Sequence, residues 1–204
     1  MAAQQNPAQL HAPDAAWRQR AGDLLADVRT AVSDLPGAET AAFDHIGSTS
    51  VPGLRAKPYL DLQIRIDPLP AEEDLTARLT PLGYRRARGA RPDSPGVDRD
   101  LPRGDEDVPD AVWEKLLYFA AQERAILHVR RSDSPWGRYT VWFRDWLRAH
   151  PPERQRYEAT KVRLAAQNAG KADYDDYPRA KTAYFDEVQP VFTAWARARG
   201  GVRG

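Results

Sequence analysis

The stretch from His45 to Ile66, HIGSTSVPGLRAKPYLDLQIRI, constrains the fold more than any other part of the chain. Its second half alternates between apolar and polar side chains (Leu60, Leu62, Ile64 and Ile66 against Asp61, Gln63 and Arg65). Because successive side chains of a strand point to opposite faces, this pattern predicts a strand over 58–66 with one apolar and one polar face. Pro52-Gly53 predicts a turn before it, and Pro58 disfavours helix at the preceding residue.

The first half of this stretch indicates a loop that could hold phosphate near a metal. Gly47 lets a ligand approach the backbone, and the hydroxyls of Ser48, Thr49 and Ser50 can contact phosphate oxygens. Asp61 on the following strand supplies a carboxylate of the kind that binds Mg²⁺. The same residues also fit a tight connection between two strands with one polar residue on the sheet surface. The loop residues alone leave both interpretations open.

Composition limits the classes of function. The chain has 204 residues, the size of one domain or of one domain with an appendage, and 42% hydrophobic residues, enough for a core. A net charge of +1, with acidic and basic residues interleaved, gives no electrostatic case for nucleic acid. The absence of cysteine excludes disulfides, thiol catalysis and thiolate metal sites. No apolar run approaches the roughly 20 residues of a membrane span. We therefore expect a cytoplasmic protein without membrane or nucleic-acid partners.

Periodicity along the chain predicts strands and helices first and helices alone afterwards. Helices are expected over 14–33, 69–82, from 135 to about 150, and over 153–168 and 177–199. Strands are expected over 41–46, 58–66, 84–88, 113–120 and 125–131. Pro190 should kink or break the last helix. This order indicates an α+β fold, a mixed sheet backed by helices with a helical C-terminal half.

Residues 14–199 are expected to form a single domain behind a mobile tail over 1–13. Residues 89–109 are rich in proline, glycine, aspartate and arginine, which predicts an exposed loop. That loop could be a lid over the site or an idle surface insertion.

Several motifs together resemble the GrpB family. They are IGSTSVPGL followed by Lys57-Pro58 and an apolar run interrupted by Asp61, LHVR around His128, WFRDWLRAHP from Trp142 to Pro151, and Tyr177 with Ala180-Lys181. The likeness extends from about Trp17 to Trp195. The version with Trp113-Glu-Lys, LHVR and FRDWLRA is also similar to the GrpB-type domain fused behind dephospho-coenzyme A kinase in actinobacteria. The chain contains no GxxxxGK[ST] phosphate loop, so we expect no kinase within it.

The resemblance implies a nucleotidyltransferase-like fold, in which a Gly-Ser pair binds nucleotide phosphates and strand carboxylates bind Mg²⁺. It therefore implies Asp61 as a metal ligand and catalytic residue, and the loop from Gly47 to Ser50 as ligand-binding. Full nucleotidyltransferases place a second carboxylate two residues further along the same strand face. In this chain Gln63 occupies that position, and an amide oxygen is a poor substitute for a charged Mg²⁺ ligand.

His128 could be a metal ligand, an acid–base group, a phosphate donor or a hydrogen-bonded structural residue. Alternation in LHVR predicts that His128 and Arg130 point to one face. The family's partner histidine, two positions before His128, is Ile126 here. If its strand neighbours that of Asp61, His128 shares the site.

Four cations could converge on an anionic ligand: Lys57, Arg130, Arg144 and Lys181. The two lysines are distinctive because the chain has five lysines and 25 arginines. An ion pair with Asp145 is an equal alternative for Arg144. The carboxyl of Asp61 is expected to face the loop from Gly47 to Ser50, on a strand beside the one that ends at Ile46.

Two functions remain open on these residues. The first is Mg²⁺-dependent nucleotidyl transfer from a nucleoside triphosphate to a small molecule. In it Ser48 would hold phosphate, Asp61 the metal, and Lys57 and Lys181 the developing charge, with His128 as a further catalytic candidate. The second is a non-catalytic module that binds a nucleotide or another anion, or stabilises a partner protein. Fold alone does not decide between these two functions. The number of carboxylates on the strand is the discriminating feature, since one favours binding and two or three favour catalysis.

Overall fold

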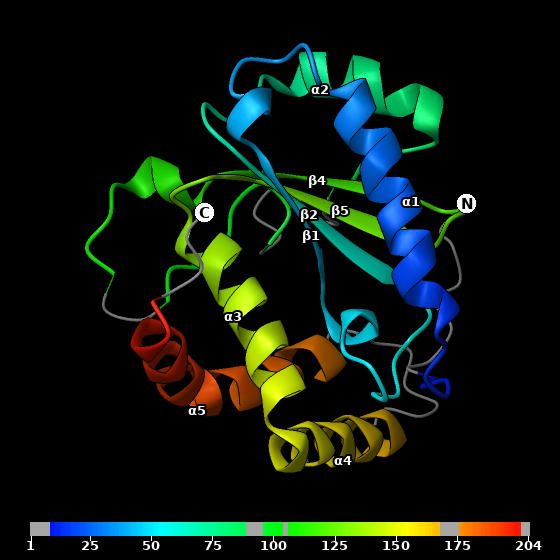
Figure 1. Cartoon of the computed structure of the whole chain (residues 1–204), viewed down its shortest axis with the longest axis vertical. Helices are drawn as coiled ribbons and strands as arrows, with labels where there is room; N and C mark the ends of the chain where they lie inside the picture. Colours follow the sequence, from blue (N-terminus) through cyan, green and yellow to red (C-terminus); the bar gives the residue numbers. More distant parts are fainter. Residues whose placement is uncertain (1–8, 89–95, 104–105, 168–175, 201–204) are drawn as a thin grey trace.

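A mixed sheet of five strands lies between two layers of helices in the computed structural model (Figure 1). The structure describes residues 9–88, 96–103, 106–167 and 176–200. The strands are β1 (Ala42–Ile46), β2 (Leu60–Ile66), β3 (Arg85–Arg86), β4 (Lys115–Ala120) and β5 (Ala125–Arg131). Their order is β1-β2-β5-β4-β3, with β2 and β5 parallel and the other pairs antiparallel.

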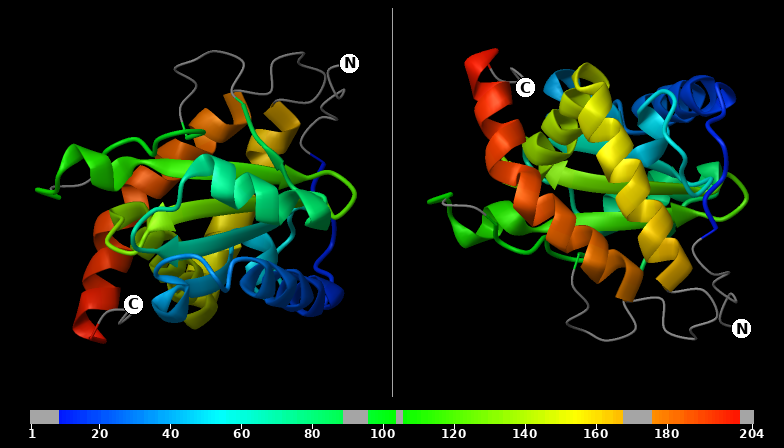
Figure 2. Two further views of the ribbon diagram at one scale, coloured as in Figure 1. Left: turned by 90° about the horizontal axis from the view of Figure 1, so that it is seen from above. Right: turned by 90° about the horizontal axis from the view of Figure 1, so that it is seen from below.

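The helices divide between the two faces of the sheet. One face carries α1 (Ala16–Ala31) and α2 (Glu72–Leu79), and the other carries α3 (Pro135–Ala149), α4 (Pro151–Gln167) and α5 (Asp176–Ala198), as Figures 1 and 2 show. Short 3₁₀ turns are η1 (Ala38–Thr40), η2 (Ser48–Ser50), η3 (Thr80–Leu82) and η4 (Asp110–Trp113). The predicted α+β class and helical C-terminal half are therefore confirmed.

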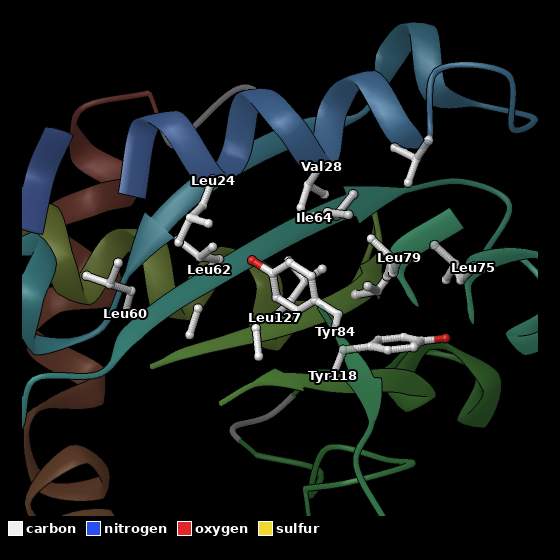
Figure 3. Close-up of a cluster of buried hydrophobic side chains, with 14 of the residues drawn as sticks. Leu24, Val28, Leu60, Leu62, Ile64, Leu75, Leu79, Tyr84, Tyr118 and Leu127 are labelled. Carbon is white, nitrogen blue, oxygen red and sulfur yellow. The ribbon is translucent and has the colours of Figure 1, made fainter. Parts of the chain in front are cut away.

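The apolar face of β2 packs under α1 and α2, as its alternation predicts (Figure 3). Leu60, Leu62, Ile64 and Ile66 are each at most 3% exposed. They meet Leu24 and Val28 of α1, Leu75 and Leu79 of α2, and Leu127 of β5. Burial of each leucine or isoleucine contributes about 1.5–3 kcal/mol, so the register of β2 is fixed by this face.

Aromatic rings form a second core among α3, α4 and α5. The ring of Phe143 lies 5.2 Å from that of Tyr157 and 5.5 Å from that of Phe192. Tyr139, Trp142 and Trp146 are at most 6% exposed and belong to this core. Pro190 lies inside α5 without ending it. Val188 and Phe192 are buried on either side of Pro190, and their packing offsets the lost hydrogen bond.

The described part of the 89–109 loop combines exposed residues with a buried anchor that its composition did not indicate. Residues 96–103 and 106–109, here called the strap, contact the sheet, α3 and α5. Asp100 is 5% exposed, and the guanidinium of Arg103 lies 4.8 Å from the ring of Trp136 and 4.9 Å from that of Phe185. Composition signalled a loop, whereas buried ion pairs and ring contacts hold it down. Residues 89–95 and 104–105 lie outside the described residues.

At the N-terminal end, residues 1–8 of the expected tail also lie outside the described residues. His11 exchanges two backbone hydrogen bonds with Ala56, of 2.8 and 3.2 Å. In the described part of the chain, no helix is long and apolar enough to cross a membrane.

Candidate functional site

The carboxyl of Asp61 lies against Gly47, where β1 ends. Ile46 pairs with Asp61 across the antiparallel β1–β2 ladder. Gly47 has φ of +69°, and a Cβ placed there would overlap Oδ2 of Asp61 and lie 2.8 Å from its Cγ. Glycine is thus required twice, for the backbone conformation and for the close approach of the carboxyl. The predicted placement of Asp61 facing the loop is confirmed.

The three hydroxyls of the loop have different surroundings. Thr49 Oγ1 donates to the carbonyl of Tyr59 at 3.2 Å and lies 2.9 Å from Nε2 of His45, whereas Ser50 Oγ donates to the carbonyl of Gly47 at 2.6 Å. These two hydroxyls hold the shape of the loop. Ser48 is partly exposed, and among the described residues its hydroxyl makes no hydrogen bond. Of the three, Ser48 is the hydroxyl best placed to meet a ligand.

Basic side chains of α3 and α4 hold the loop from outside. They donate to main-chain carbonyls in four places: Arg144 to His45, Arg148 to Ser50, Arg154 to Pro52 and Lys161 to Arg55. The carboxylate of Glu158 accepts from the backbone N–H of Arg55 at 2.8 Å. Since the helices of the C-terminal half make these bonds, they fix the path of the loop and of the segment leading to Lys57.

Arg144 belongs to this support. Its guanidinium donates to both carboxylate oxygens of Asp145, at 2.8 and 3.0 Å, and lies 3.5 Å from Asp44. The Asp145 pair, one of the two alternatives for Arg144, is therefore present. Because the carboxylates of Asp145 and Asp44 neutralise its guanidinium, Arg144 has little attraction for an external anion.

Lys57 and Lys181 approach Asp61 from distant segments. Burial raises the pKa of Asp61, and Lys181, Arg130 and Lys57 oppose that rise. Burial and then the repulsion of Lys181 lower the pKa of Lys57 to about 8, with Asp61 acting in the opposite direction. Lys57 precedes β2 and Lys181 lies on α5, so two amines from distant segments lie near enough to Asp61 to affect its pKa.

Arg130 is fully engaged within the protein. It donates to Asp100 at 2.6 and 3.1 Å and to Oε1 of Gln63 at 2.8 Å. Lys115 lies 3.0 Å from the same carboxylate of Asp100. Arg130 is 2% exposed. Its side chain thus links the strap to the sheet and is not available for a ligand.

Gln63 has no freedom to act as a substitute carboxylate. Besides the bond from Arg130, its Oε1 accepts from Thr140 Oγ1 at 3.0 Å, and its Nε2 donates to the carbonyl of Gly137 at 3.0 Å. The side chain is 0% exposed. Gln63 therefore joins β2 to α3. An aspartate at this position would lose the bond to Gly137, so the exchange does not simply add a metal ligand.

His128 lies on the same sheet face as Asp61, one strand away and opposite Gln63 in the parallel β2–β5 ladder. Nδ1 of His128 is 3.4 Å from both Lys115 Nζ and Arg130 Nη2. Because both neighbours donate, Nδ1 accepts and the ring proton is on Nε2. Burial, followed by Lys115, Arg130 and Lys181, lowers the pKa of His128 well below its usual value. The ring is therefore neutral, and Nε2–H is a hydrogen-bond donor.

The donor set suits an anion better than a resident metal. No group of three or more histidine, aspartate or glutamate side chains is arranged to hold a metal within the described residues. Mg²⁺ is commonly held by one or two carboxylates together with substrate phosphates. Asp61 fits one Mg²⁺ that arrives with phosphate oxygens, and a single carboxylate does not fit a two-metal centre.

Two site-forming residues carried little sequence signal. Lys161 is 1% exposed, and burial, then Lys181, lower its pKa to about 7. The rarity of lysine in this chain was the signal that could have identified it. Asp100 lies in a segment whose composition indicated only a loop.

Comparison with known proteins gives concordant matches. A family model described as "GrpB protein" matches residues 7–190. A dephospho-CoA kinase of Mycolicibacterium paratuberculosis is 29% identical over 201 residues, covering 95% of this chain and 48% of the kinase. The chain thus spans about half the length of the dephospho-CoA kinases that it matches. A UPF0157 protein of Streptomyces coelicolor is 34% identical over 154 residues, covering 76% of this chain and 69% of the relative.

The fold is also similar to a solved structure. The crystal structure of the conserved protein GrpB from Enterococcus faecalis aligns with a TM-score of 0.68 at 19% identity, over 92% of this chain and 99% of that chain. At this identity the likeness concerns the fold.

Proposed function

Because the chain belongs to the GrpB family and has its nucleotidyltransferase-like fold, we propose that the site at Gly47 and Ser48 binds the phosphates of a small molecule. A nucleoside triphosphate is the ligand that the fold favours. The observation that carries the proposal is the contact of the Asp61 carboxyl with Gly47, beside the partly exposed Ser48, with Lys57 and Lys181 near enough to oppose the rise that burial causes in the pKa of Asp61.

Charge supports an anionic ligand. Two amines and one carboxylate leave the site net positive, and the repulsion between Lys57 and Lys181 contributes to the lowered pKa of Lys57. A bound phosphate would relieve that repulsion. Ser48 in the loop and Nε2–H of His128, on the same sheet face as Asp61, are neutral donors, and neutral and charged donors together are typical of phosphate sites.

Nucleotidyl transfer to a small molecule is the second candidate. It is favoured by Asp61, which holds the strand position beside a Gly-Ser loop that the metal-binding carboxylate holds in nucleotidyltransferases. In such a reaction an acceptor oxygen would attack the α-phosphorus and pyrophosphate would leave. The engagement of Gln63 with α3 and Arg130 argues for ligand binding without this step. A role beside a protein partner is a further alternative, since the matched dephospho-CoA kinases contain as much chain again.

Calorimetric titration with ATP, with and without Mg²⁺, tests the proposal. We expect Lys57→Met to weaken ATP binding at least tenfold, because one charge-assisted contact is lost. Arg78→Met, which removes a positive charge from α2 on the opposite face of the sheet, is the matched control and should leave affinity unchanged. Equal affinities of wild type and Lys57→Met would contradict the proposal.

Asp61→Asn distinguishes the two ways in which the site could hold phosphate. If Asp61 binds an ion carried by the nucleotide, the substitution abolishes the Mg²⁺ dependence of binding. If the site takes the bare anion, loss of the carboxylate reduces repulsion and tightens binding without Mg²⁺. Release of pyrophosphate by the wild type, and not by Asp61→Asn, would establish transfer.

A further inference from the structure

The sheet face that carries Asp61 continues into an apolar surface. Ile126 pairs with Asp61 on one side and with Phe119 on the other, and Leu117 pairs with His128. These three side chains, here called the apolar floor, are only partly buried, whereas Leu127 and Tyr118 on the opposite face are 0% exposed. Partly exposed apolar side chains therefore begin directly beside the candidate anion site.

Tyr59 borders the apolar floor. It lies two residues before Asp61, is 39% exposed, and its ring stacks on that of Phe119 with centroids 6.1 Å apart and an interplanar angle of 29°. An amphipathic ring exposed in this way beside a polar site offers a face on which another ring can stack. Tyr59 is the most exposed of the Phe, Trp and Tyr side chains whose burial the structure describes, a set that excludes residues 176–180.

Helix and strap contacts lie to either side of this surface. Hydrogen bonds between α3 and the sheet reach Gln63 on β2 and the carbonyl of His45 on β1. Those of the strap reach Arg130 and Lys115, one end of β5 and β4. The row from Asp61 through Ile126 to Phe119 is at the other end of the same strands, so the apolar floor is flanked by fixed elements.

We infer that the ligand has two parts, a phosphate group at Gly47–Ser48 and a heteroaromatic ring that stacks on Phe119 and Tyr59 over the apolar floor. The inference rests on the proposed function and adds the place where the ring of the ligand binds. Neighbouring strands are roughly 4.8 Å apart, so Phe119, two strands from Asp61, is roughly 10 Å away, within the length of one small molecule. Ile126 lies between the two parts, and His128 lies in the next row of the same sheet face, opposite Gln63 and Leu117.

The test compares ATP with tripolyphosphate, which has the phosphates and lacks the ring. In calorimetry on the wild type we expect ATP to bind at least tenfold more tightly. Stacking on an aromatic side chain is commonly worth about five- to a hundredfold in affinity. Phe119→Ala and Tyr59→Ala should each remove most of the advantage of ATP and leave tripolyphosphate binding within about twofold of wild type. Phe119→Tyr and Tyr59→Phe, which keep the ring, should retain the advantage.

Val191→Ala, on the exposed side of α5, is the control and should change neither affinity. Because Phe119 is half-buried, its alanine variant is compared with wild type in urea denaturation, and the exposed Tyr59 gives an independent test. Equal binding of the two probes, or equal losses for both in Tyr59→Ala, would overturn the ring site while leaving the phosphate site in place. Failure of the wild type to bind either probe would refute both proposals.

Discussion

The contact between Gly47 and Asp61 makes the site sensitive to a single methyl group. Gly47→Ala would introduce both an unfavourable positive φ and an overlap with the carboxyl of Asp61. We expect a loss of more than about 1 kcal/mol in the free energy of unfolding and loss of ATP binding. Urea denaturation and calorimetry measure the two effects.

Gly83→Ala is the matched control for that substitution. Gly83 also has a positive φ, of +84°, and no atom lies within 4 Å of a Cβ built there. It should therefore show the backbone cost alone and keep ATP binding. Equal unfolding free energies and equal ATP affinities for the two variants would show that the carboxyl of Asp61 does not depend on Gly47.

His45 gives the loop a dependence on pH. Burial, followed by Arg148 and Arg144, lowers its pKa from 6.5 to about 4. The folded state therefore binds a proton less readily than the unfolded chain. The contribution of His45 to stability is full above pH 6.5 and is lost as the pH falls towards 4.

Urea denaturation at pH 7 and at pH 4.5 measures this loss. We expect the wild type to lose on the order of 2 kcal/mol more than His45→Gln over that interval. Glutamine can still bond to Thr49 but does not titrate. Identical losses in the two proteins would mean that His45 has an ordinary pKa in the folded state.

Among the elements, the strap depends on Asp100. Its carboxylate pairs with Arg130 and Lys115, and all three side chains are at most 6% exposed. Asp100→Asn should cost about 3–5 kcal/mol of unfolding free energy, since two buried cations lose their counter-charge. Asp110→Asn removes an exposed ion pair of Arg99, a strap residue, and should leave stability unchanged. Similar effects of the two substitutions in urea denaturation would refute a buried anchor at Asp100.

Periodicity predicted most elements of the fold. The strand β2 and the helix α1 were predicted from their apolar faces, because the period of apolar residues along each segment reflects which side chains are buried. The expected strand over 84–88 is reduced to Arg85–Arg86, and the expected helix over 69–82 to Glu72–Leu79 with a 3₁₀ turn after it. Ends of elements depend on contacts from elsewhere in the chain, which local patterns do not encode.

Within the site, the adjacency of Asp61 and Gly47 followed from a short connection and a strand register. The engagement of Gln63 and Arg130 did not. Their partners come from α3 and the strap, and no sequence spacing relates Asp100 to Arg130. A polar residue on a predicted strand face can therefore be placed on that face from sequence, whereas its hydrogen-bond partners cannot.

For the whole molecule, α5 connects the aromatic core with the candidate site. Phe192 is 0% exposed within that core, and Lys181 of the same helix influences Asp61. Phe192→Ala should cost about 3–5 kcal/mol through the cavity it leaves and should weaken ATP binding through displacement of Lys181. Val191→Ala, with a side chain 57% exposed, is the control. Unchanged ATP affinity in a destabilised Phe192→Ala would show that the core and the site are independent.

The placement of the lysines also makes the molecule selective towards amine-reactive reagents. Arginine supplies 25 of the 30 basic side chains, and of the described lysines Lys115 and Lys161 are buried while Lys57 and Lys181 are half-buried. Acylation requires the neutral amine, and Lys57, with a pKa of about 8, has far more of it at neutral pH than an ordinary lysine. Because Nζ of Lys57 is itself buried, brief acetylation followed by peptide mass spectrometry should modify Lys57 only when the site opens, and so should report that opening. Protection of Lys57 by ATP would report occupancy of the site directly, with no need to know what the protein makes.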